Sequence, residues 1–178
     1  ACLGGLNTLE FLPNGEVSVD PVIVSRKFLD EFQQNLILYY TSHNRHSGKI
    51  IEEQILHVQQ RDPGPVEAMH QLKKQSRQLR AAFLREDYGA IASLIDKGFG
   101  HKKKMASGIT NDRIDSIYKA AKEAGALAGK ISGAGGGGFM IFCVSPGTAE
   151  NVRKALLNFA GREFHFHFDS EGLTTWRE

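Results

Sequence analysis

The chain has 178 residues, of which 41% are hydrophobic and 24% are charged, and its formal net charge is +2. This length and composition predict one folded domain with a sizeable core and exclude a disordered chain. The basic residues are spread along the sequence, which argues against a nucleic-acid partner. No apolar segment reaches the roughly 20 residues of a membrane span. The two distant cysteines support no disulfide framework, so we expect a cytoplasmic protein.

The first 24 residues predict a β-hairpin followed by an extended segment. Apolar residues flank Pro13, Asn14 and Gly15, and from Val17 onward they alternate with polar residues. An Asn-Gly pair between two such runs is a strong local signal for a hairpin. Because the hairpin precedes the main body of the pattern, it is a candidate part of a neighbouring domain.

A helix and a buried strand are expected next. Ser25 is a typical N-cap residue, and Phe28, Leu29 and Phe32 follow it at helical spacing. Residues 35–41, NLILYYT, form a short and nearly continuous apolar run that is rich in aromatic residues. Such a run is typical of a strand that is buried on both faces.

The middle of the chain, residues 47–125, changes to a helical period. Four helices are expected, running from Ser47 to the RDPGP segment at 61–65, from about Val66 to Phe83, from about Asp87 onward, and from Thr110 or Asn111 to Gly125. The acidic residues in the first turn of the last helix suit the positive end of its dipole.

The C-terminal part predicts a strand, a helix and a second strand. FMIFCV at 139–144 is apolar, the residues after Pro146 have helical spacing, and REFHFHF at 162–168 alternates phenylalanine with histidine. His165 and His167 would share one face of this strand, but without a third ligand nearby a solvent-exposed pair is favoured over a metal site. Strands and helices alternate irregularly around a helical block, which indicates the α+β class.

A glycine-rich segment, KISGAGGGG at 130–138, lies between the fourth helix and the strand at 139–144. Its glycines match the G-x-G-x-x-G spacing, but in dinucleotide-binding folds such glycines follow a strand and open a helix. Here the expected order is helix, loop and strand, and no Lys-Ser or Lys-Thr completes a P-loop. A run with almost no side chains can direct its backbone N–H groups at an anion. The same lack of side chains would let a substrate or another loop approach closely. We therefore favour a turn that faces a ligand or another loop over a flexible linker.

Four stretches of the sequence, two of which overlap at 130–138, resemble a known family. KISGAGGGGFMIFCV resembles the third signature of the GHMP kinases, the superfamily of galactokinase, homoserine kinase, mevalonate kinase and phosphomevalonate kinase. LILYYTSHNRHSGKIIEEQ at 36–54, NDRIDSIYKAAKEAGALAGKISGAGGGG at 111–138 and the ending FHFDSEGLTTW resemble more narrowly the D-glycero-D-manno-heptose 7-phosphate kinases. The resemblance implies a ferredoxin-like C-terminal substrate domain at 25–178, in which an antiparallel sheet packs against helices. Residues 1–24 would be a hairpin of the N-terminal, ATP-binding domain.

The resemblance also implies an ATP-dependent kinase that uses Mg²⁺ and phosphorylates the anomeric hydroxyl of the heptose 7-phosphate. In such kinases the ATP loop and the catalytic carboxylates would precede Ala1, so we expect a fragment without catalytic residues, without metal ligands and without turnover of its own. Other kinases of the superfamily, acting on fucose, galactose or mevalonate, are alternatives. A non-catalytic regulatory or interaction module on the same fold is another, and the sequence leaves a monomer and a homodimer both open.

The resemblance places the binding of the sugar phosphate on two segments. The residues concerned are Ser132, Gly133, Ala134, Gly135, Gly136 and Gly137 of the glycine turn, its neighbour Lys130, and Thr41, Ser42 and Arg45 after the strand at 35–41. Arg45 suits bidentate binding of a phosphate, with a surface arginine as the alternative. Lys130 could bind phosphate or lie in solvent. Lys102 and Lys103 match a basic pair of the family, but we interpret them first as a solvated helix face. The segment TSHNR and the absence of a tryptophan before the basic pair depart from the family and leave the identity of the sugar open.

Overall fold

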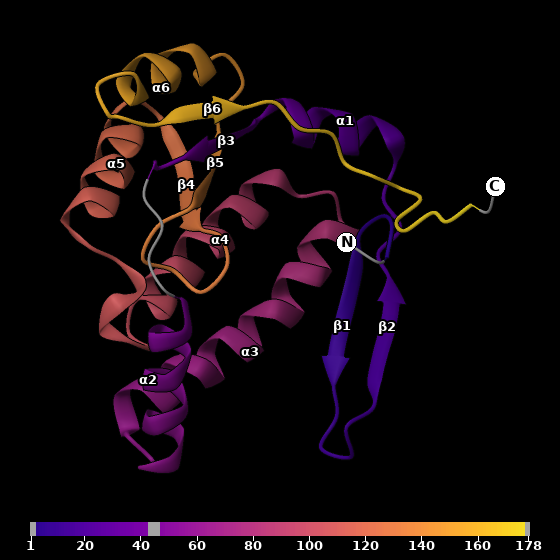
Figure 1. The fold of residues 1–178 in the computed structure, drawn as a ribbon. Coiled ribbons are helices and arrows are strands. Elements are labelled where there is room, and N and C mark those ends of the chain that lie inside the picture. The colour runs from indigo at the N-terminus through magenta and orange to yellow at the C-terminus, as the bar shows by residue number, and fades with distance from the viewer. Residues whose placement is uncertain (1–2, 43–46, 177–178) are drawn as a thin grey trace.

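The computed structural model describes residues 3–42 and 47–176 (Figure 1). In chain order the elements are β1 Asn7–Phe11, β2 Val17–Pro21, α1 Arg26–Gln34, β3 Leu36–Tyr40, α2 Ser47–Gln59, α3 Pro63–Leu84, α4 Tyr88–Lys102, the short 3₁₀ helix η1 Ser107–Ile109, α5 Asp112–Glu123, β4 Ala126–Ile131, β5 Phe139–Val144, α6 Ala149–Leu156 and β6 Arg162–Phe164. No helix in these described ranges is both long and apolar enough to cross a membrane.

The centre of the fold is a four-stranded antiparallel sheet with the strand order β4-β5-β3-β6. The order of strands and helices along the chain is the split β-α-β arrangement of ferredoxin-like folds, with the block from α2 to α5 placed between the first two strands. The register pairs Tyr39 with Met140 and Ile131 with Met140, so β5 lies between β3 and β4. The expected α+β class with an antiparallel sheet is therefore confirmed.

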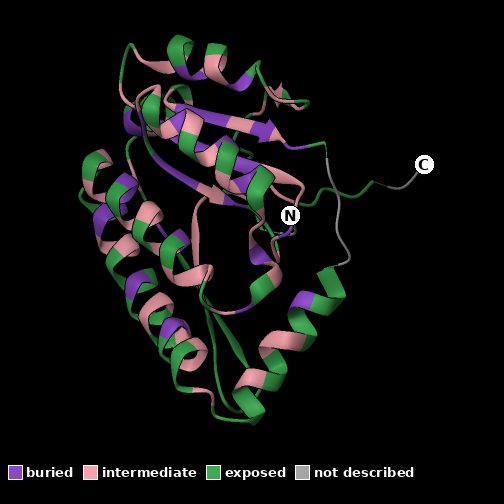
Figure 2. Ribbon diagram, turned by 90° about the vertical axis from the view of Figure 1, so that its left-hand side faces the viewer, coloured by how far each residue is buried: buried purple, intermediate pink, exposed green. Residues whose placement is uncertain are grey.

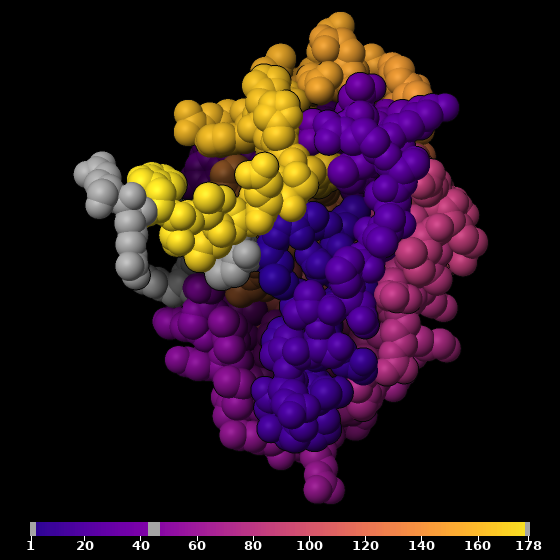
Figure 3. Space-filling model, turned by 90° about the vertical axis from the view of Figure 1, so that its right-hand side faces the viewer, coloured from indigo at the N-terminus to yellow at the C-terminus, as the bar shows by residue number. Residues whose placement is uncertain are grey.

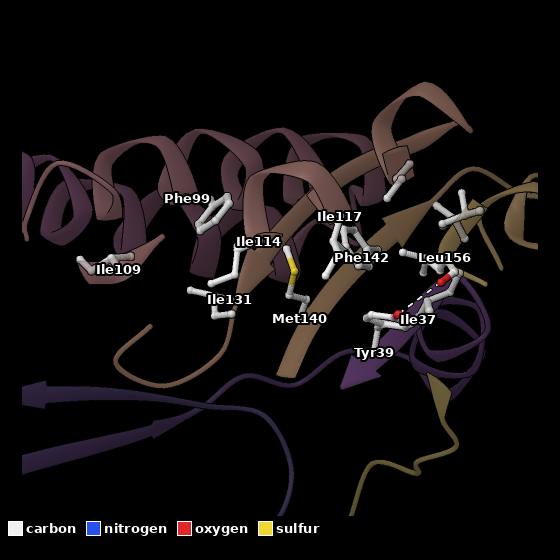
Figure 4. Packing of buried hydrophobic residues seen from close by; sticks show 14 of the residues in the cluster. Ile37, Tyr39, Phe99, Ile109, Ile114, Ile117, Ile131, Met140, Phe142 and Leu156 are labelled. Carbon is white, nitrogen blue, oxygen red and sulfur yellow. Dashed lines mark hydrogen bonds between the residues drawn. The ribbon is translucent and has the colours of Figure 1, made fainter. Parts of the chain in front are cut away.

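The larger core lies between the sheet and helices α5 and α6. Ile37 of β3, Ile117 of α5 and Phe142 of β5 are fully buried in it, and Figure 4 shows these side chains meeting from different elements. The Tyr39 hydroxyl donates a hydrogen bond to the carbonyl of Leu156 over 3.2 Å, which connects the sheet to the end of α6. Burial of the Tyr39 hydroxyl costs little free energy, because the hydroxyl keeps a hydrogen-bond partner.

A second core joins α1, α3 and α4 to the other side of the sheet. Phe32 of α1 and Phe83 of α3 meet edge to face with ring centroids 5.3 Å apart, and Ala128 and Cys143 of the sheet belong to the same cluster. Burial raises the pKa of the Cys143 thiol to about 12. The thiol therefore behaves as a small apolar group, as the apolar run around it predicts.

Two strands differ from the sequence predictions. The glycine segment follows strand β4 and not directly a helix, so the expected order of helix, loop and strand is wrong. The alternation at 162–168 predicts a long strand, whereas β6 ends at Phe164 because only Arg162–Phe164 pairs with β3. His165 and His167 are exposed, as expected.

Helix α3 begins earlier than expected. Pro63 and Pro65 lie in its first turn, where backbone N–H groups have no acceptor within the helix, so proline loses no helical hydrogen bond there. The RDPGP segment therefore starts α3 as well as ending α2.

The hairpin β1–β2 extends from the body beside α3 (Figure 1). Every residue of β2 is exposed (Figure 2), and the hairpin forms the middle of the face in Figure 3, where the yellow C-terminal segment crosses above it. The N–H of Gly5 donates to the carbonyl of Asp169 at 2.8 Å, which connects the two terminal segments. Assignment of residues 1–24 to a separate ATP-binding domain stays a prediction.

Candidate functional site

The glycine loop, residues 132–138, connects β4 to β5 and is fixed at its base. The N–H of Ser132 donates to the carbonyl of Phe139 at 2.7 Å. The carbonyl of Gly138 accepts from both the N–H and the Oγ1 hydroxyl of Thr41, each at 2.9 Å. Thr41 is completely buried, so its side chain supports the loop from the end of β3.

The middle of the loop packs against η1. The N–H of Gly136 donates to the carbonyl of Ile109 at 2.9 Å, and the side-chain amide of Asn111 donates to the carbonyl of Gly136 at 3.3 Å. A Cβ atom on Gly135 would lie 2.7 Å from the Cα of Ile109, closer than real Cβ contacts allow. The absence of a side chain at Gly135 therefore permits this contact between two backbones.

The loop also leaves backbone donors unused. Gly133, Gly135, Gly136 and Gly138 have φ of +71°, +121°, +77° and +85°, in the region that favours glycine. In the ranges 3–42 and 47–176, the amides of Gly133, Ala134 and Gly135 meet no protein acceptor. Ser132 and Gly133 are exposed. Successive amides in such a turn form a concave site for an anion.

Two lysines stand beside the loop. Lys102, in the last turn of α4, donates from its ammonium group to the carbonyl of Gly133. Burial and the charge of the nearby Lys130 on β4 lower the pKa of Lys102 to about 8. Both lysines line the same cavity. Two ammonium groups at close range repel one another, and an anion between them would remove that repulsion.

The structure brings most of the expected site residues together. Residues 132–137 and Thr41 meet through the bonds described above, Lys130 joins them through its proximity to Lys102, and Ser42 follows Thr41 with φ +56° in an exposed position. Arg45 lies outside the described residues.

Lys102 and Lys103 differ from the solvated pair that the sequence predicts. Lys103 pairs with Asp115 at 3.2 Å and lies 5.0 Å from the ring centroid of Phe99. Lys102 instead reaches the glycine loop. A signal for this position existed in the sequence, because Lys102 follows Leu94, Ile95 and Gly98 on the apolar stripe of α4.

A second polar cluster joins α2 to η1 and α3. The carboxylate of Glu53 accepts from the N–H and the hydroxyl of Ser107 at 2.7 and 3.1 Å, and these bonds lower the pKa of Glu53. His57 contacts Asp62 at 2.6 Å, which raises the pKa of His57. Glu53 is therefore a structural link between α2 and η1. Across the described ranges no three His, Cys, Asp or Glu side chains are grouped to hold a metal ion.

The glycine loop, Lys102 and Lys130 all lie in a segment that matches a known family. Residues 79–163 match the family model described as GHMP kinases C terminal. Residues 79–163 therefore correspond to the C-terminal domain of the GHMP kinases. The glycine loop and both lysines thus lie within the matched part of this domain.

Similar proteins extend the match over nearly the whole chain. A D-glycero-alpha-D-manno-heptose 7-phosphate kinase from Campylobacter jejuni is 37% identical over 99% of this chain and 52% of its own length. A solved D-glycero-D-manno-heptose 1-phosphate kinase from Bacteriodes thetaiotaomicron is 30% identical, with a TM-score of 0.68, over 98% of this chain and 47% of that one. The mevalonate kinase of L. major shares the fold, with a TM-score of 0.71 at 22% identity over 87% of this chain and 45% of that one. The chain spans about half the length of the heptose kinase relatives that it matches.

Proposed function

We propose that this chain is the sugar-binding half of an ATP-dependent kinase that phosphorylates the anomeric hydroxyl of D-glycero-D-manno-heptose 7-phosphate. One observation carries the proposal: the glycine loop is held in place by Thr41 and Ile109 yet leaves amides unbonded beside Lys102 and Lys130. A fixed turn with free amides and adjacent ammonium groups is suited to a phosphate group. The similarity to heptose phosphate kinases suggests the sugar.

The position of the substrate's phosphate is the finer part of the proposal. One relative is named a 7-phosphate kinase and the other a 1-phosphate kinase. We infer the 7-phosphate as substrate because the relative with that name is more similar, at 37% identity against 30%. A kinase that acts on the 7-phosphate adds its phosphate at carbon 1 and yields a bisphosphate.

The residues of this chain would bind and orient the sugar phosphate. Free amides of the loop would donate to its phosphate oxygens, and Lys102 and Lys130 would neutralise its charge. Transfer of a phosphoryl group depends mainly on positioning and charge neutralisation, so such groups supply much of what the reaction requires. Arg45 stays a candidate for the same phosphate.

The donor groups of the site suit phosphate and do not suit a metal ion. The glycine loop offers N–H groups and the two lysines offer ammonium groups, whereas Mg²⁺ requires oxygen ligands, usually carboxylates. The described part of the chain contains no cluster of three suitable side chains. We therefore assign Mg²⁺ and ATP to a part of the kinase outside this chain and expect binding without turnover here.

Binding of sugar phosphate to the isotope-labelled chain tests the proposal. Heptose 7-phosphate should shift the amide NMR signals of residues 133–137, and Lys102→Gln should weaken binding about tenfold by removing a charged donor. Lys104→Gln is the matched control, because Lys104 is exposed in the turn that directly follows the same helix. Equal binding by both variants, or no shift in the loop, would overturn the proposal.

A panel of ligands separates the alternatives. Tighter binding of fucose, galactose or mevalonate than of heptose 7-phosphate would favour another GHMP substrate. A regulatory module would bind none of these. Once the substrate is known, ADP release by the kinase assembled with its ATP-binding part would measure phosphorylation directly.

A further inference from the structure

Asn111 connects the first turn of α5 to the glycine loop. Its backbone is extended, with φ −157° and ψ 170°, so the residue stands just outside the helix as its N-cap. Its Oδ1 accepts from the N–H of Ile114 at 3.0 Å, and its carbonyl accepts from the N–H of Asp115 at 2.9 Å. These two bonds fix Asn111 to the helix and leave the Nδ2 group of its side chain available for another bond.

The cap determines which end of the side-chain amide faces the loop. Because Oδ1 accepts from Ile114, Nδ2 lies on the other side, where it donates to the carbonyl of Gly136 at 3.3 Å. A serine or an aspartate would also cap the helix. Serine, however, has no second polar group to offer the carbonyl, and an ionised aspartate has no donor. Asparagine is the residue type that caps the helix and also binds the loop.

The bond to Gly136 sets the direction of the next amide in the loop. No peptide bond in the described residues is cis, and in a trans peptide the C=O and the N–H that follows it point in opposite directions. The carbonyl of Gly136 points to Asn111, so the N–H of Gly137 points away from it. In the ranges 3–42 and 47–176 this N–H meets no protein acceptor. Gly136 is buried and Gly137 is half-buried, so the peptide that Asn111 holds leads from the interior toward the surface of the loop.

We propose that Asn111 is a positioning residue for phosphate at the glycine loop. By holding the carbonyl of Gly136, it directs the N–H of Gly137 at the phosphate, alongside the amides of residues 133–135. This inference rests on the proposed function, since it requires that the phosphate of the substrate binds at the loop. It adds a fourth amide to that site and names the residue of α5 that orients it.

The proposal implies a specific defect when the donor at position 111 is lost. The residues on both sides of the peptide are glycines, and glycine imposes few steric limits on rotation. Without the bond from Asn111 the peptide between Gly136 and Gly137 can therefore rotate, and its N–H loses its direction. Ordering this peptide again when phosphate binds costs conformational entropy, so the affinity for phosphate falls.

Titration of the isotope-labelled 178-residue chain with heptose 7-phosphate and, separately, with inorganic phosphate tests this role. In the wild-type chain both ligands should shift the amide NMR signal of Gly137 together with those of residues 133–135. Asn111→Ser keeps a helix cap but should bind both ligands about fivefold more weakly, because a hydrogen bond to a charged group loses its alignment. In this variant the shift of Gly137 should shrink more than that of Ala134, which a general loss of stability would not produce.

Asp87→Ser is the matched control for the helix cap. Asp87 accepts from the N–H of Ala90 at 2.9 Å as the N-cap of α4. It lies at the end of α4 remote from Lys102, about 22 Å away along the helix. A charge removed at that distance is largely screened at physiological salt, so Asp87→Ser should bind both ligands like the wild-type chain. Circular dichroism should show that both variants keep their helices.

The possible outcomes separate this inference from the proposed function. Shifts at residues 133–135 without one at Gly137, or equally tight binding by Asn111→Ser and the wild-type chain, would overturn the inference and leave the proposed function unaffected. Equal weakening in Asn111→Ser and Asp87→Ser would also overturn it, because the effect would then come from the caps. If inorganic phosphate shifts Gly137 and heptose 7-phosphate binds no more tightly than inorganic phosphate, the proposed sugar is wrong and the role of Asn111 is supported. No shift anywhere in the loop would overturn both proposals.

Discussion

The two hairpin turns of this chain are built from similar residues but are held in different ways. The turn between β1 and β2 is stabilised within itself: Leu12 donates to the carbonyl of Glu16 at 2.9 Å, and Gly15 to that of Leu12 at 3.0 Å. The glycine loop between β4 and β5 is stabilised from outside, by Thr41, Ile109 and Lys102. A Cβ atom on Gly15 would meet nothing within 4 Å, whereas one on Gly135 would meet the backbone of η1.

The difference shows what glycine does in each turn. In the first turn Gly15, at φ +86°, supplies a backbone conformation and needs no other partner. In the second, the glycines also permit contact with a distant part of the chain. Ordering a run of glycines costs more conformational entropy than ordering other residues. Contacts with three other elements offset that cost, which is what a loop with a fixed binding geometry requires.

Gly135→Ala should have the largest effect on stability. The new Cβ would lie 2.7 Å from the Cα of Ile109, and the residue would keep φ near +121°, where alanine is strained. Strain and overpacking together should lower the free energy of unfolding by about 3 kcal/mol. Urea unfolding measures this loss directly.

Gly133→Ala is the control for this substitution. Gly133 also has a positive φ, of +71°, but a Cβ there would meet nothing within 4 Å. Only the backbone strain applies, so the expected loss is about 1 kcal/mol. Equal losses at the two positions would mean that the contact with η1 does not hold the loop.

Thr41→Val should have the next largest effect. The two side chains have almost the same shape, but valine cannot donate to the carbonyl of Gly138. Because Thr41 is completely buried, the expected loss is about 1–2 kcal/mol. Thr8→Val, on the partly exposed strand β1, should change stability by less than about 0.5 kcal/mol. A neutral Thr41→Val would show that β3 does not support the loop.

Local signals in the sequence predict much of this fold. The caps Ser25, Asp87 and Asn111 each accept a backbone N–H at the start of a helix, as their residue types predict. The apolar runs at 36–40 and 139–144 form the two central strands. These elements follow from short-range preferences that tertiary packing does not override.

Strand β4 could not be predicted in this way. Its sequence, ALAGKI, is rich in residues that disfavour strands. The structure explains why β4 has a glycine at position 129: a Cβ atom there would lie 2.8 Å from the ring of Phe142 and 3.0 Å from that of Tyr118. Packing against these rings requires a small residue, and no local pattern reveals that requirement.

Only part of the candidate site can be predicted from the sequence, because its contacts, like those of β4, join residues that are far apart in the chain. The glycine loop is evident from composition, but its contacts with Ile109 and Thr41 join residues far apart in the sequence. The sequence does not predict the contact between Lys102 and the loop, because a run of lysines normally indicates a solvated face. Its position on the apolar stripe of α4 was the stronger signal.

A smaller effect on stability is expected from the charge of Lys102, which lies beside the glycine loop and has no counterpart among the contacts of the turn between β1 and β2 described above. The folded pKa of Lys102, about 8, lies below the ordinary value of 10.5. Between these values the unfolded chain holds more protons than the folded one, so stability rises with pH across this window. Allowing for solvent screening, the rise from about pH 7.5 to about pH 9.5 should be about 1 kcal/mol.

Lys102→Gln should remove this rise, and Lys104→Gln should keep it. Urea unfolding at several pH values measures both variants. If the slope of stability against pH is the same in both, the ammonium of Lys102 is as well solvated as that of Lys104, and the second turn has no buried charge beside it.

The smallest effect on stability is expected in the turn between β1 and β2. Asn14 Oδ1 accepts from the N–H of Glu16 at 3.1 Å, in an exposed position. Asn14→Ala removes this bond, but water can replace it, so the expected loss is about 0.5 kcal/mol by urea unfolding. If Asn14→Ala cost as much as Thr41→Val, the first turn would depend on more than its own residues. A loss well below that of Thr41→Val would instead mean that the two turns differ in stability because one is tied to the core and the other only to itself.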